Sequence, residues 1–538
     1  MTQHAHASSQ ANQRHAASTA PPATATPSVA VVMVTWNRVS EVRRSIESVL
    51  AQKHVDQGAI HLVVVDNAST DGTTEALTGW LKPERLVRNN TTHADKPAFD
   101  ATNTGHANTA GLASVTLVRN TANLGGTGGF NTGFLTVEHI LTTDTPIDFL
   151  WLLDDDAVAD PTALASLLQT TADDPAAGLV GSRAVDIADR QTTYETTIYY
   201  DPRQGRMAET PHTGHRLRDT HAQWVDAVGD TRGDLEFAGV REVDVVSACS
   251  MLARWSVVQQ VGYWDRRYFI YCDDADWCLR VGRSGSKVVC DLDAVVYHTP
   301  WFQKLTPTRL YYAERNAIWT MRKGLSGSAR RTSTARWMRS VLRSSLAAGL
   351  RRRLYHAEIL RKTASDAATN TAGRLTQAEP PHEPITAALE RLNLNRADAS
   401  LAFLCMTADQ ATLARDITTT LRSALGNTCP RPRFITRNDA GTGDITYAPS
   451  TRSRLRRQLP LLTNAPDACV VLNNTNDFPL LRCPTTLHID HRDPNRCQVE
   501  HDSLGCRLAF FCRWSATTMR AIWYVLRNKP QQPPAPFG

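Results

Sequence analysis

The stretch Phe149-Leu-Trp-Leu-Leu153 is followed at once by Asp154-Asp155-Asp156. Five apolar residues of this kind predict a strand that is buried on both faces of a sheet. Three adjacent carboxylates behind such a strand repel one another unless a cation neutralises them. Because side chains alternate along an extended chain, Asp154 and Asp156 are expected to point the same way and Asp155 elsewhere. These oxygen ligands suit Mg²⁺ or Mn²⁺ holding a diphosphate, whereas a helix cap would need only one Asp.

Strands and helices alternate around this stretch. Apolar runs predict further strands, and helical spacing of apolar residues predicts the helices between them. The predicted strands cover residues 29–35, 61–65 and 114–118, and the predicted helices cover residues 39–52 and 73–81. This alternation indicates an α/β fold with a mainly parallel sheet and helices on both faces. Since working residues gather at the carboxyl ends of parallel strands, Thr35, Asp66 and Asp154 are candidates for one site.

Glycine is concentrated behind the strand at 114–118, where Asn123-Leu-Gly125-Gly126-Thr-Gly-Gly-Phe130 begins a run with five glycines within residues 125–133. Glycines let the backbone approach a ligand closely and offer amides to anionic groups. A glycine-rich turn without a ligand is the equal alternative. The run contains no Gly-Lys-Ser/Thr and does not follow the first strand, so it is neither a phosphate loop of that type nor a dinucleotide fingerprint.

Acidic and aromatic residues are interleaved in Tyr268-Phe-Ile-Tyr-Cys-Asp273-Asp274-Ala-Asp276-Trp277. Acids in a first helical turn are favoured by the helix dipole, which is one explanation of this segment. The other is that aromatic rings stack on a sugar while a carboxylate takes a proton from an attacking hydroxyl. His298 follows another short strand, where a neutral imidazole could complete a metal shell.

Composition limits the class of protein. The chain has 538 residues, a net charge of +6 and 11 cysteines without a Cys-x-x-Cys pair. No run approaches the ~20 apolar residues of a membrane-spanning helix. Residues 1–27 lack the apolar core of a signal peptide. We therefore expect reduced thiols and a cytoplasmic protein, with attachment to the inner face of the plasma membrane as an open alternative.

The chain divides into six predicted parts. They are a disordered tail at 1–27, a first α/β domain at 28–325, a basic helical segment at 326–363, a linker at 364–384, a small α/β domain at 385–528 and a flexible tail at 529–538. The basic segment carries ten Arg and Lys residues against Glu358 alone. Two interpretations stay open for it: a helix docked on its own protein with a solvated cationic face, or attachment to an anionic membrane.

The second α/β unit carries one crowded polar cluster. His488, Asp490, His491 and Asp493 lie at and behind a predicted strand. Residues at a strand end are usually solvated, and we favour that interpretation over a metal site.

Taken together, these segments resemble the family 2 glycosyltransferases of the GT-A fold over residues 29–323. The resemblance rests on Thr35-Trp-Asn-Arg, Asp66-Asn-Ala-Ser, the glycine-rich run, Asp154-Asp-Asp, the Asp-Asp-Ala-Asp segment and His298. The glycine-rich run and the Asp-Asp-Ala-Asp segment look most like bacterial galactofuranosyltransferases of cell-envelope polysaccharide synthesis. Rhamnosyltransferases share much of the pattern. Cys272 departs from the Trp expected in galactan polymerases, which leaves the acceptor open.

The resemblance implies a role for each motif. It implies an inverting, metal-dependent transfer of a sugar, most simply galactofuranose, from a UDP-sugar to a glycan or lipid-linked glycan. Asp274 would be the general base. The remaining implied roles are acceptor binding by Asp273, Asp276 and Trp277; nucleotide-sugar binding by Thr35, Asn37, Asp66, Asn123, Gly125, Gly126 and Asp155; and binding of Mn²⁺ or Mg²⁺ by Asp154, Asp156 and His298.

Three other classes of protein fit the sequence less well. A glycan-binding relative without catalysis would be expected to have lost at least one of Asp154, Asp156, Asp274 and His298. A nucleotidyltransferase would need a basic, glycine-rich loop after the first strand, which Thr35-Trp-Asn-Arg does not supply. Nucleic-acid binding by the basic segment is disfavoured because aromatic residues are not interleaved there, so we expect no nucleic-acid partner.

Overall fold

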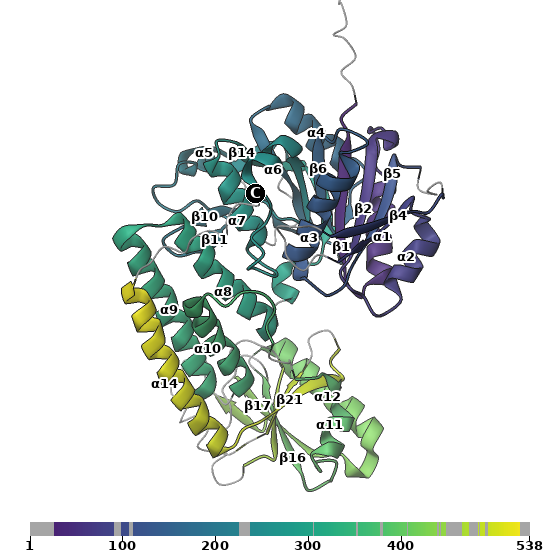
Figure 1. The fold of residues 1–538 in the computed structure, drawn as a ribbon. Coiled ribbons are helices and arrows are strands. Elements are labelled where there is room, and N and C mark those ends of the chain that lie inside the picture. Colours follow the sequence, from purple (N-terminus) through teal and green to yellow (C-terminus); the bar gives the residue numbers. More distant parts are fainter. Residues whose placement is uncertain are drawn as a thin grey trace, which may run out of the picture.

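The computed structural model describes most of the chain. The described residues are 26–90, 98–106, 111–224, 237–304, 306–350, 353–376, 380–405, 407–437, 441, 443–447, 465–472, 483, 485–489 and 493–527. The predicted tails, 1–27 and 529–538, therefore lie almost wholly outside the described residues. Figure 1 shows two sheet-containing units joined by a layer of helices.

The first unit contains a twelve-stranded mixed sheet in the order β12-β14-β8-β13-β6-β1-β2-β5-β3-β4, with β7 on β14 and β9 on β8. Its centre is parallel, since β1 pairs with both β2 and β6, and β2 pairs with β5. β13 is antiparallel to β6 and β8 on either side of it. The strands are β1 Val29–Thr35, β2 Ile60–Asp66, β3 Arg85–Asn89, β4 Phe99–Asn103, β5 Ser114–Asn120, β6 Phe149–Asp154, β7 Val158–Ala159, β8 Ala177–Asp186, β9 Thr193–Glu195, β12 Val240–Val243, β13 Ser250–Arg254 and β14 Lys287–His298.

Helices cover both faces of this sheet. Two separate cores result, one on each face, because the strand side chains alternate between them. The helices of this unit are α1 Val39–Leu50, α2 Thr73–Leu81, α3 Gly125–Thr136, α4 Ala163–Asp173, α5 Arg218–Trp224, α6 Trp255–Val261 and α7 Asp273–Arg283. The predicted fold class, a mainly parallel α/β sheet of GT-A type, is confirmed, and β1 and α2 have the predicted bounds. The β3–β4 hairpin and the antiparallel strands were not predicted.

The glycine-rich run forms the first turns of α3 and not a loop. A Cβ atom at Gly129 would lie 2.3 Å from Val34, and one at Gly133 would lie 2.2 Å from Val32. These glycines therefore let α3 pack directly on β1. Gly125 has φ +74°, and a Cβ atom there would lie 2.1 Å from the carbonyl oxygen of Phe269. The start of α3 thus touches the segment that leads into Asp273 and Asp274.

A helical layer follows the first unit. It consists of α8 Pro307–Gly324, α9 Gly327–Leu350, α10 Leu354–Thr369 and, from the end of the chain, α14 Leu504–Arg527. The predicted basic segment is therefore two helices, and α10 extends into the predicted linker at 364–384. Figure 1 shows α14 lying along α9 and α10 at the edge of the molecule. This helix was assigned to the second α/β unit from sequence but packs on the helical layer.

The second unit is a seven-stranded sheet in the order β15-β21-β20-β19-β16-β17-β18. Its inner strands are parallel, whereas β21 is antiparallel to β20 and pairs with the short antiparallel edge strand β15. Its elements are β15 Glu383–Pro384, α11 Ile385–Arg391, β16 Ser400–Cys405, α12 Ala408–Leu425, β17 Arg431–Arg437, β18 Ile445–Tyr447, β19 Ala468–Val471, β20 Thr485–Ile489 and β21 Arg496–His501.

Candidate active site

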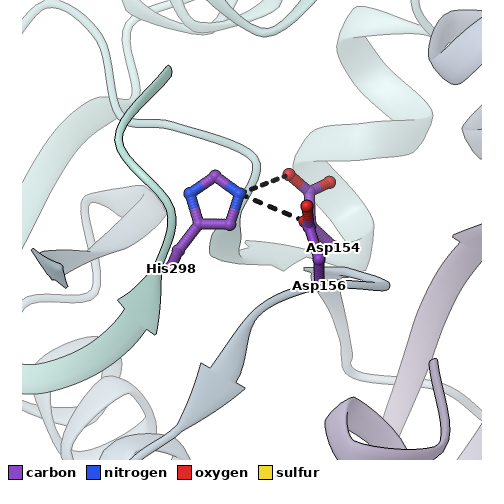
Figure 2. A group of neighbouring side chains, drawn as sticks. All are labelled: Asp154, Asp156 and His298. Carbon is purple, nitrogen blue, oxygen red and sulfur yellow. Dashed lines mark hydrogen bonds and ion pairs between the residues drawn. The ribbon is translucent and has the colours of Figure 1, made fainter. Parts of the chain in front are cut away.

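Asp154, Asp156 and His298 meet at the carboxyl ends of β6 and β14, although the histidine is more than 140 residues away in sequence. His298 Nε2 lies 3.2 Å from Asp156 Oδ1 and 3.8 Å from Asp154 Oδ2. Figure 2 shows both carboxylates directed at the same ring nitrogen of the imidazole. The other ring nitrogen, Nδ1, lies 2.8 Å from the Tyr194 hydroxyl, which fixes the ring orientation. The structure therefore brings together the three residues that the resemblance implies as metal ligands.

Two basic side chains neutralise this acidic cluster. Lys304 Nζ, at the end of the short helix η3 (Trp301–Lys304), lies 2.7 Å from Asp156 Oδ2 and 2.8 Å from His298 Nε2. Arg38 Nη1 lies 2.6 Å from Asp156 Oδ2 and 3.2 Å from Asp155 Oδ1. Burial alone would raise the pKa of Asp156, but the hydrogen bond with His298 and the charges of Lys304 and Arg38 outweigh it and lower that pKa. Asp156 is therefore ionised at neutral pH.

The residues fit a divalent cation. Among the described residues, Asp154, Asp156 and His298 form a group whose ligand atoms all lie within 4.8 Å of one another. Two carboxylates and an imidazole, with the second imidazole nitrogen held by Tyr194, are a suitable donor set for Mn²⁺ or Mg²⁺. Burial raises the pKa of Asp154, and the neighbouring charge of Asp156 adds to the effect. A bound cation would relieve this repulsion, so the three side chains are suited to hold one.

Asp274 lies at the start of α7, across from the metal cluster. Its carboxylate accepts hydrogen bonds from the backbone N–H of Ala275 at 2.7 Å and of Ala248 at 3.4 Å. The next residue, Cys249, accepts a hydrogen bond from the backbone N–H of Asp154 at 3.3 Å. The short segment 248–249 therefore holds the base candidate and the metal cluster side by side. Burial raises the pKa of Asp274, the backbone donors oppose this, and the charge of Asp154 adds to it.

The structure places the three predicted acceptor-binding residues in the interior of the protein, and acceptor binding by them stays a prediction. Trp277 is fully buried, packs on Phe134, and donates its indole N–H to the carbonyl of Gly262 at 2.8 Å. Asp276 is also buried and bonds to Lys323 Nζ at 2.8 Å. Asp273 is buried and accepts a hydrogen bond from Thr127 Oγ1 in α3.

The reason is helical geometry. Residues that are adjacent in α7 face different directions, so the helix that presents Asp274 turns its neighbours into the core. The acidic and aromatic composition of residues 268–277 therefore suggests more exposure than the structure shows.

The predicted nucleotide-binding residues hold the loops at the ends of the central strands. Asp66 is fully buried and accepts hydrogen bonds from Ser69 N, at 2.9 Å, and from Thr74 Oγ1. Asn37, with φ 54°, accepts a hydrogen bond from Thr70 N at 2.8 Å, so it joins the β1 and β2 loops.

The other predicted nucleotide-binding residues lie around these loops. Thr35 is buried at the end of β1. Asn123 accepts a hydrogen bond from Gly125 N at 2.8 Å, which starts α3, and Gly126 follows within the same turn. Asp155 pairs with Arg38. In this structure Asp66, Asn37 and Asn123 shape the loops, and contact between any of these residues and a nucleotide stays a prediction.

Sequence reasoning missed four residues of the site. Arg38 and Lys304 could have been suspected, since Arg38 ends the Thr35-Trp-Asn-Arg motif and Lys304 follows His298 by six residues. Tyr194 and Glu195 carried no such signal because they lie on the short strand β9 (Thr193–Glu195), far from every motif. Burial raises the pKa of the Glu195 carboxyl to about 8, with a contribution from the charge of Asp274.

The polar cluster of the second unit does not form a comparable centre within the described residues. His488 is buried on β20, with Nε2 3.7 Å from Glu500 Oε2. Asp490 and His491 lie outside the described residues, and Asp493 accepts a hydrogen bond from the N–H of Asn495.

Two family models match the chain. Residues 30–98 match the model described as "Glycosyl transferase family 2", and residues 100–339 match "Glycosyltransferase like family 2". Together they span the first unit, α8 and part of α9. No curated protein matches the sequence.

Solved structures show distant similarity. One is GalNAc-T7 with UDP, GalNAc and Mn²⁺ (12% identity, 55% of this chain and 48% of that chain, TM-score 0.37). A second is the Pyrobaculum calidifontis mannosyltransferase PcManGT with GDP-Man and Mn²⁺ (17% identity, 76% and 88%, TM-score 0.35). A third is S. aureus TarS 1-349 (11% identity, 64% and 80%, TM-score 0.37). The chain spans about half the length of GalNAc-T7.

Proposed function

Residues 30–339 make this chain a member of the family 2 glycosyltransferases, and on that premise we propose that it transfers a sugar from a nucleoside-diphosphate donor to an acceptor hydroxyl with inversion at the anomeric carbon. One observation carries the proposal. The segment 248–249 bonds to Asp274 on one side and to Asp154 on the other. One two-residue segment thus holds both the buried carboxylate and the acidic cluster, and this supports a direct displacement of a nucleoside diphosphate by a hydroxyl.

Each side chain has one task in this reaction. When bound by Asp154, Asp156 and His298, a divalent cation supplies Lewis-acid stabilisation of the negative charge that develops on the departing diphosphate. Asp274 accepts the proton of the acceptor hydroxyl as that oxygen attacks the anomeric carbon from the face opposite the diphosphate. General-base assistance of this kind contributes about 10²–10⁴ in rate. The raised pKa of Asp274 makes its carboxylate a better base than an exposed Asp.

We further propose galactofuranose from a UDP-sugar as the transferred group, and a glycan or lipid-linked glycan of the cell envelope as the acceptor. This rests on the resemblance in the glycine-rich run and the Asp-Asp-Ala-Asp segment. The contacts between Gly125 and Phe269 and between Thr127 and Asp273 support it, because the two motifs form one structural unit. Transfer of rhamnose is the alternative. With such an acceptor, the enzyme works as a peripheral protein at the inner face of the plasma membrane.

The experiment is product analysis by mass spectrometry with a panel of UDP- and dTDP-sugars, a lipid-linked acceptor and Mn²⁺. We expect a product one or more hexose masses heavier with UDP-galactofuranose. A product formed only with dTDP-rhamnose would replace the proposed donor. Binding of a UDP-sugar with no release of UDP and no glycosylated product in any combination would indicate a glycan-binding relative without catalysis and would refute the proposal.

A further inference from the structure

The outer face of α14 carries exposed large apolar side chains near both ends of the helix. Leu504, Leu508, Met519, Ile522, Trp523 and Leu526 are each between 50% and 68% exposed. At ~100° per residue, these positions fall within one stripe on the helix, together with the small residues Ser515 and Ala516. The helix has 24 residues and is therefore about 36 Å long. Several exposed large apolar side chains on one face of a helix mark an interaction site.

The opposite face of α14 is fixed on the helical layer. Phe510 is buried against Gly349, where a Cβ atom would lie 2.3 Å from its ring. Trp514 donates its indole N–H to the carbonyl of Leu342 at 3.0 Å. Ala521 is buried in the cluster formed by α8, α9 and α10. The apolar stripe therefore cannot turn inward by rotation of the helix without breaking these contacts.

Positive charge borders the stripe. α14 contains four arginines and no Asp or Glu, and the neighbouring α9 contains five arginines and no acid. Arg513, Arg520 and Arg527 follow one edge of the stripe, and the guanidinium of Arg527 lies 3.4 Å from the centre of the Trp523 ring. Arg513 is half-exposed and pairs with Glu358. An uncharged strip edged by arginines suits a partner that is apolar inside and anionic at its surface.

We propose that α14 is an interfacial helix that binds the surface of an anionic lipid bilayer. The stripe from Leu504 to Leu526 enters the boundary between headgroups and acyl chains, and the arginines contact lipid phosphates. The helix lies in the plane of the surface, since none of the described helices is long and apolar enough to cross a membrane. A second copy of the chain is a poorer partner, because a symmetric pair of these faces would bring the two sets of arginines together.

Packed side chains connect α14 with the segment that precedes the active-site residue Asp274. Ala521 of α14 shares one buried cluster with Trp337 and Met338 of α9 and with Tyr268 and Cys272, directly before Asp273. Binding through α14 therefore holds the segment that carries the base in a fixed orientation to the bilayer. The inference deepens the peripheral membrane attachment proposed above and depends on it, but it does not depend on the identity of the sugar.

The test is co-sedimentation of the full chain with vesicles of phosphatidylcholine alone or with about 30% phosphatidylglycerol. We expect binding to the anionic vesicles that weakens with salt, as interfacial electrostatics require. The variant Met519→Gln/Ile522→Gln/Trp523→Gln removes three exposed apolar side chains and should bind at least about tenfold more weakly. Arg520→Gln/Arg527→Gln should weaken binding to the anionic vesicles only.

Matched controls test whether vesicle binding is specific to this surface and whether the variants are folded. Met207→Gln/Val240→Gln removes two exposed apolar side chains of the first unit and should bind like wild type. Circular dichroism and transfer to a soluble acceptor should be unchanged in the α14 variants, since these residues do not touch the site. Failure of transfer with normal vesicle binding would refute the proposed function and leave this inference standing.

Three results would overturn the inference. The first is wild-type protein that does not bind anionic vesicles, or binds neutral ones equally well. The second is a triple α14 variant that binds like wild type. The third is a dimer, detected by analytical ultracentrifugation without lipid, that the same triple substitution dissociates, because the stripe would then be an interface between two copies.

Discussion

Replacing Asp274 by Asn separates the chemical role of this residue from its structural role. The side chains have the same size, so Asn can still accept one of the two backbone hydrogen bonds, from Ala248 or Ala275, that the carboxylate accepts. It cannot accept a proton from an acceptor hydroxyl. We expect kcat to fall by about 10²–10⁴, the range for loss of a general base. At 1.36 kcal/mol per tenfold change in rate, this corresponds to about 3–5 kcal/mol of transition-state stabilisation.

The same substitution should not destabilise the protein. Burial raises the pKa of Asp274 above its ordinary value, so the folded state binds the proton more tightly than the unfolded state. That contribution to stability is present at low pH and is lost as the pH rises through the raised pKa. At pH 8 the ionised carboxylate therefore opposes folding, and Asn removes this cost. Asn accepts one backbone hydrogen bond fewer than the carboxylate. This loss costs about 1 kcal/mol and partly offsets the gain in stability. We expect a free energy of unfolding equal to or slightly above that of wild type.

The assays are UDP release for kcat, calorimetric titration with UDP-sugar for donor binding, and urea unfolding at pH 8. Asp273→Asn is the matched control: its carboxylate is buried and bonds to Thr127, so kcat should change by less than about tenfold. Near wild-type turnover in Asp274→Asn would refute the base assignment. An equal loss of kcat in both variants would show that kcat depends on the combined charge of Asp273 and Asp274 and not on the position of Asp274.

Three further outcomes are expected. Lys304→Met removes a cation 2.7 Å from Asp156 and should raise Mn²⁺ affinity about tenfold at low salt in calorimetry; unchanged affinity would show that the lysine does not compete with the metal. Since burial raises the pKa of the Asp274 base to about 6, kcat/KM should rise with pH up to that region and then level off, and a flat profile down to pH 5 would contradict this. Gly133→Ala places Cβ 2.2 Å from Val32 and should cost about 1–3 kcal/mol in urea unfolding, whereas Gly282→Ala, with nothing within 4 Å of its Cβ, should cost nothing.

The central elements could be predicted from sequence because their signals are local. An uninterrupted β-branched run predicted β1 with its observed bounds, and apolar spacing predicted α2. The approach of His298 to Asp154 and Asp156 was predicted from the resemblance, and strand order explains it: β14 lies beside β8, and β7, which directly follows Asp156, pairs with the end of β14.

The errors arose where tertiary packing decides. Glycine disfavours helices, yet the run at 125–133 is helical because only glycine lets α3 approach Val32 and Val34. Asp276 resembled an exposed acid, but Lys323, far along the chain, compensates its charge in the interior. Trp277 resembled a sugar-stacking residue and is instead a core residue. The sequence alone does not show which face of α7 is covered, since that depends on α3 and α8.

The connection of α14 to the helical layer was also hidden from local patterns. The chain that precedes it belongs to the second sheet, so its place in the sequence suggests packing on that sheet. Only the contacts of Phe510 and Trp514 with α9 show which face is buried. Once the buried face is known, the opposite face of α14 can be identified as the exposed one.

The most direct test of the account is anomalous diffraction at the manganese edge from crystals soaked with Mn²⁺ and UDP. The account predicts one strong peak bounded by Asp154, Asp156 and His298, with the UDP phosphates beside it and Lys304 displaced from Asp156. A bound UDP with no anomalous scatterer among these three side chains, or a manganese ion elsewhere in the chain, would contradict it.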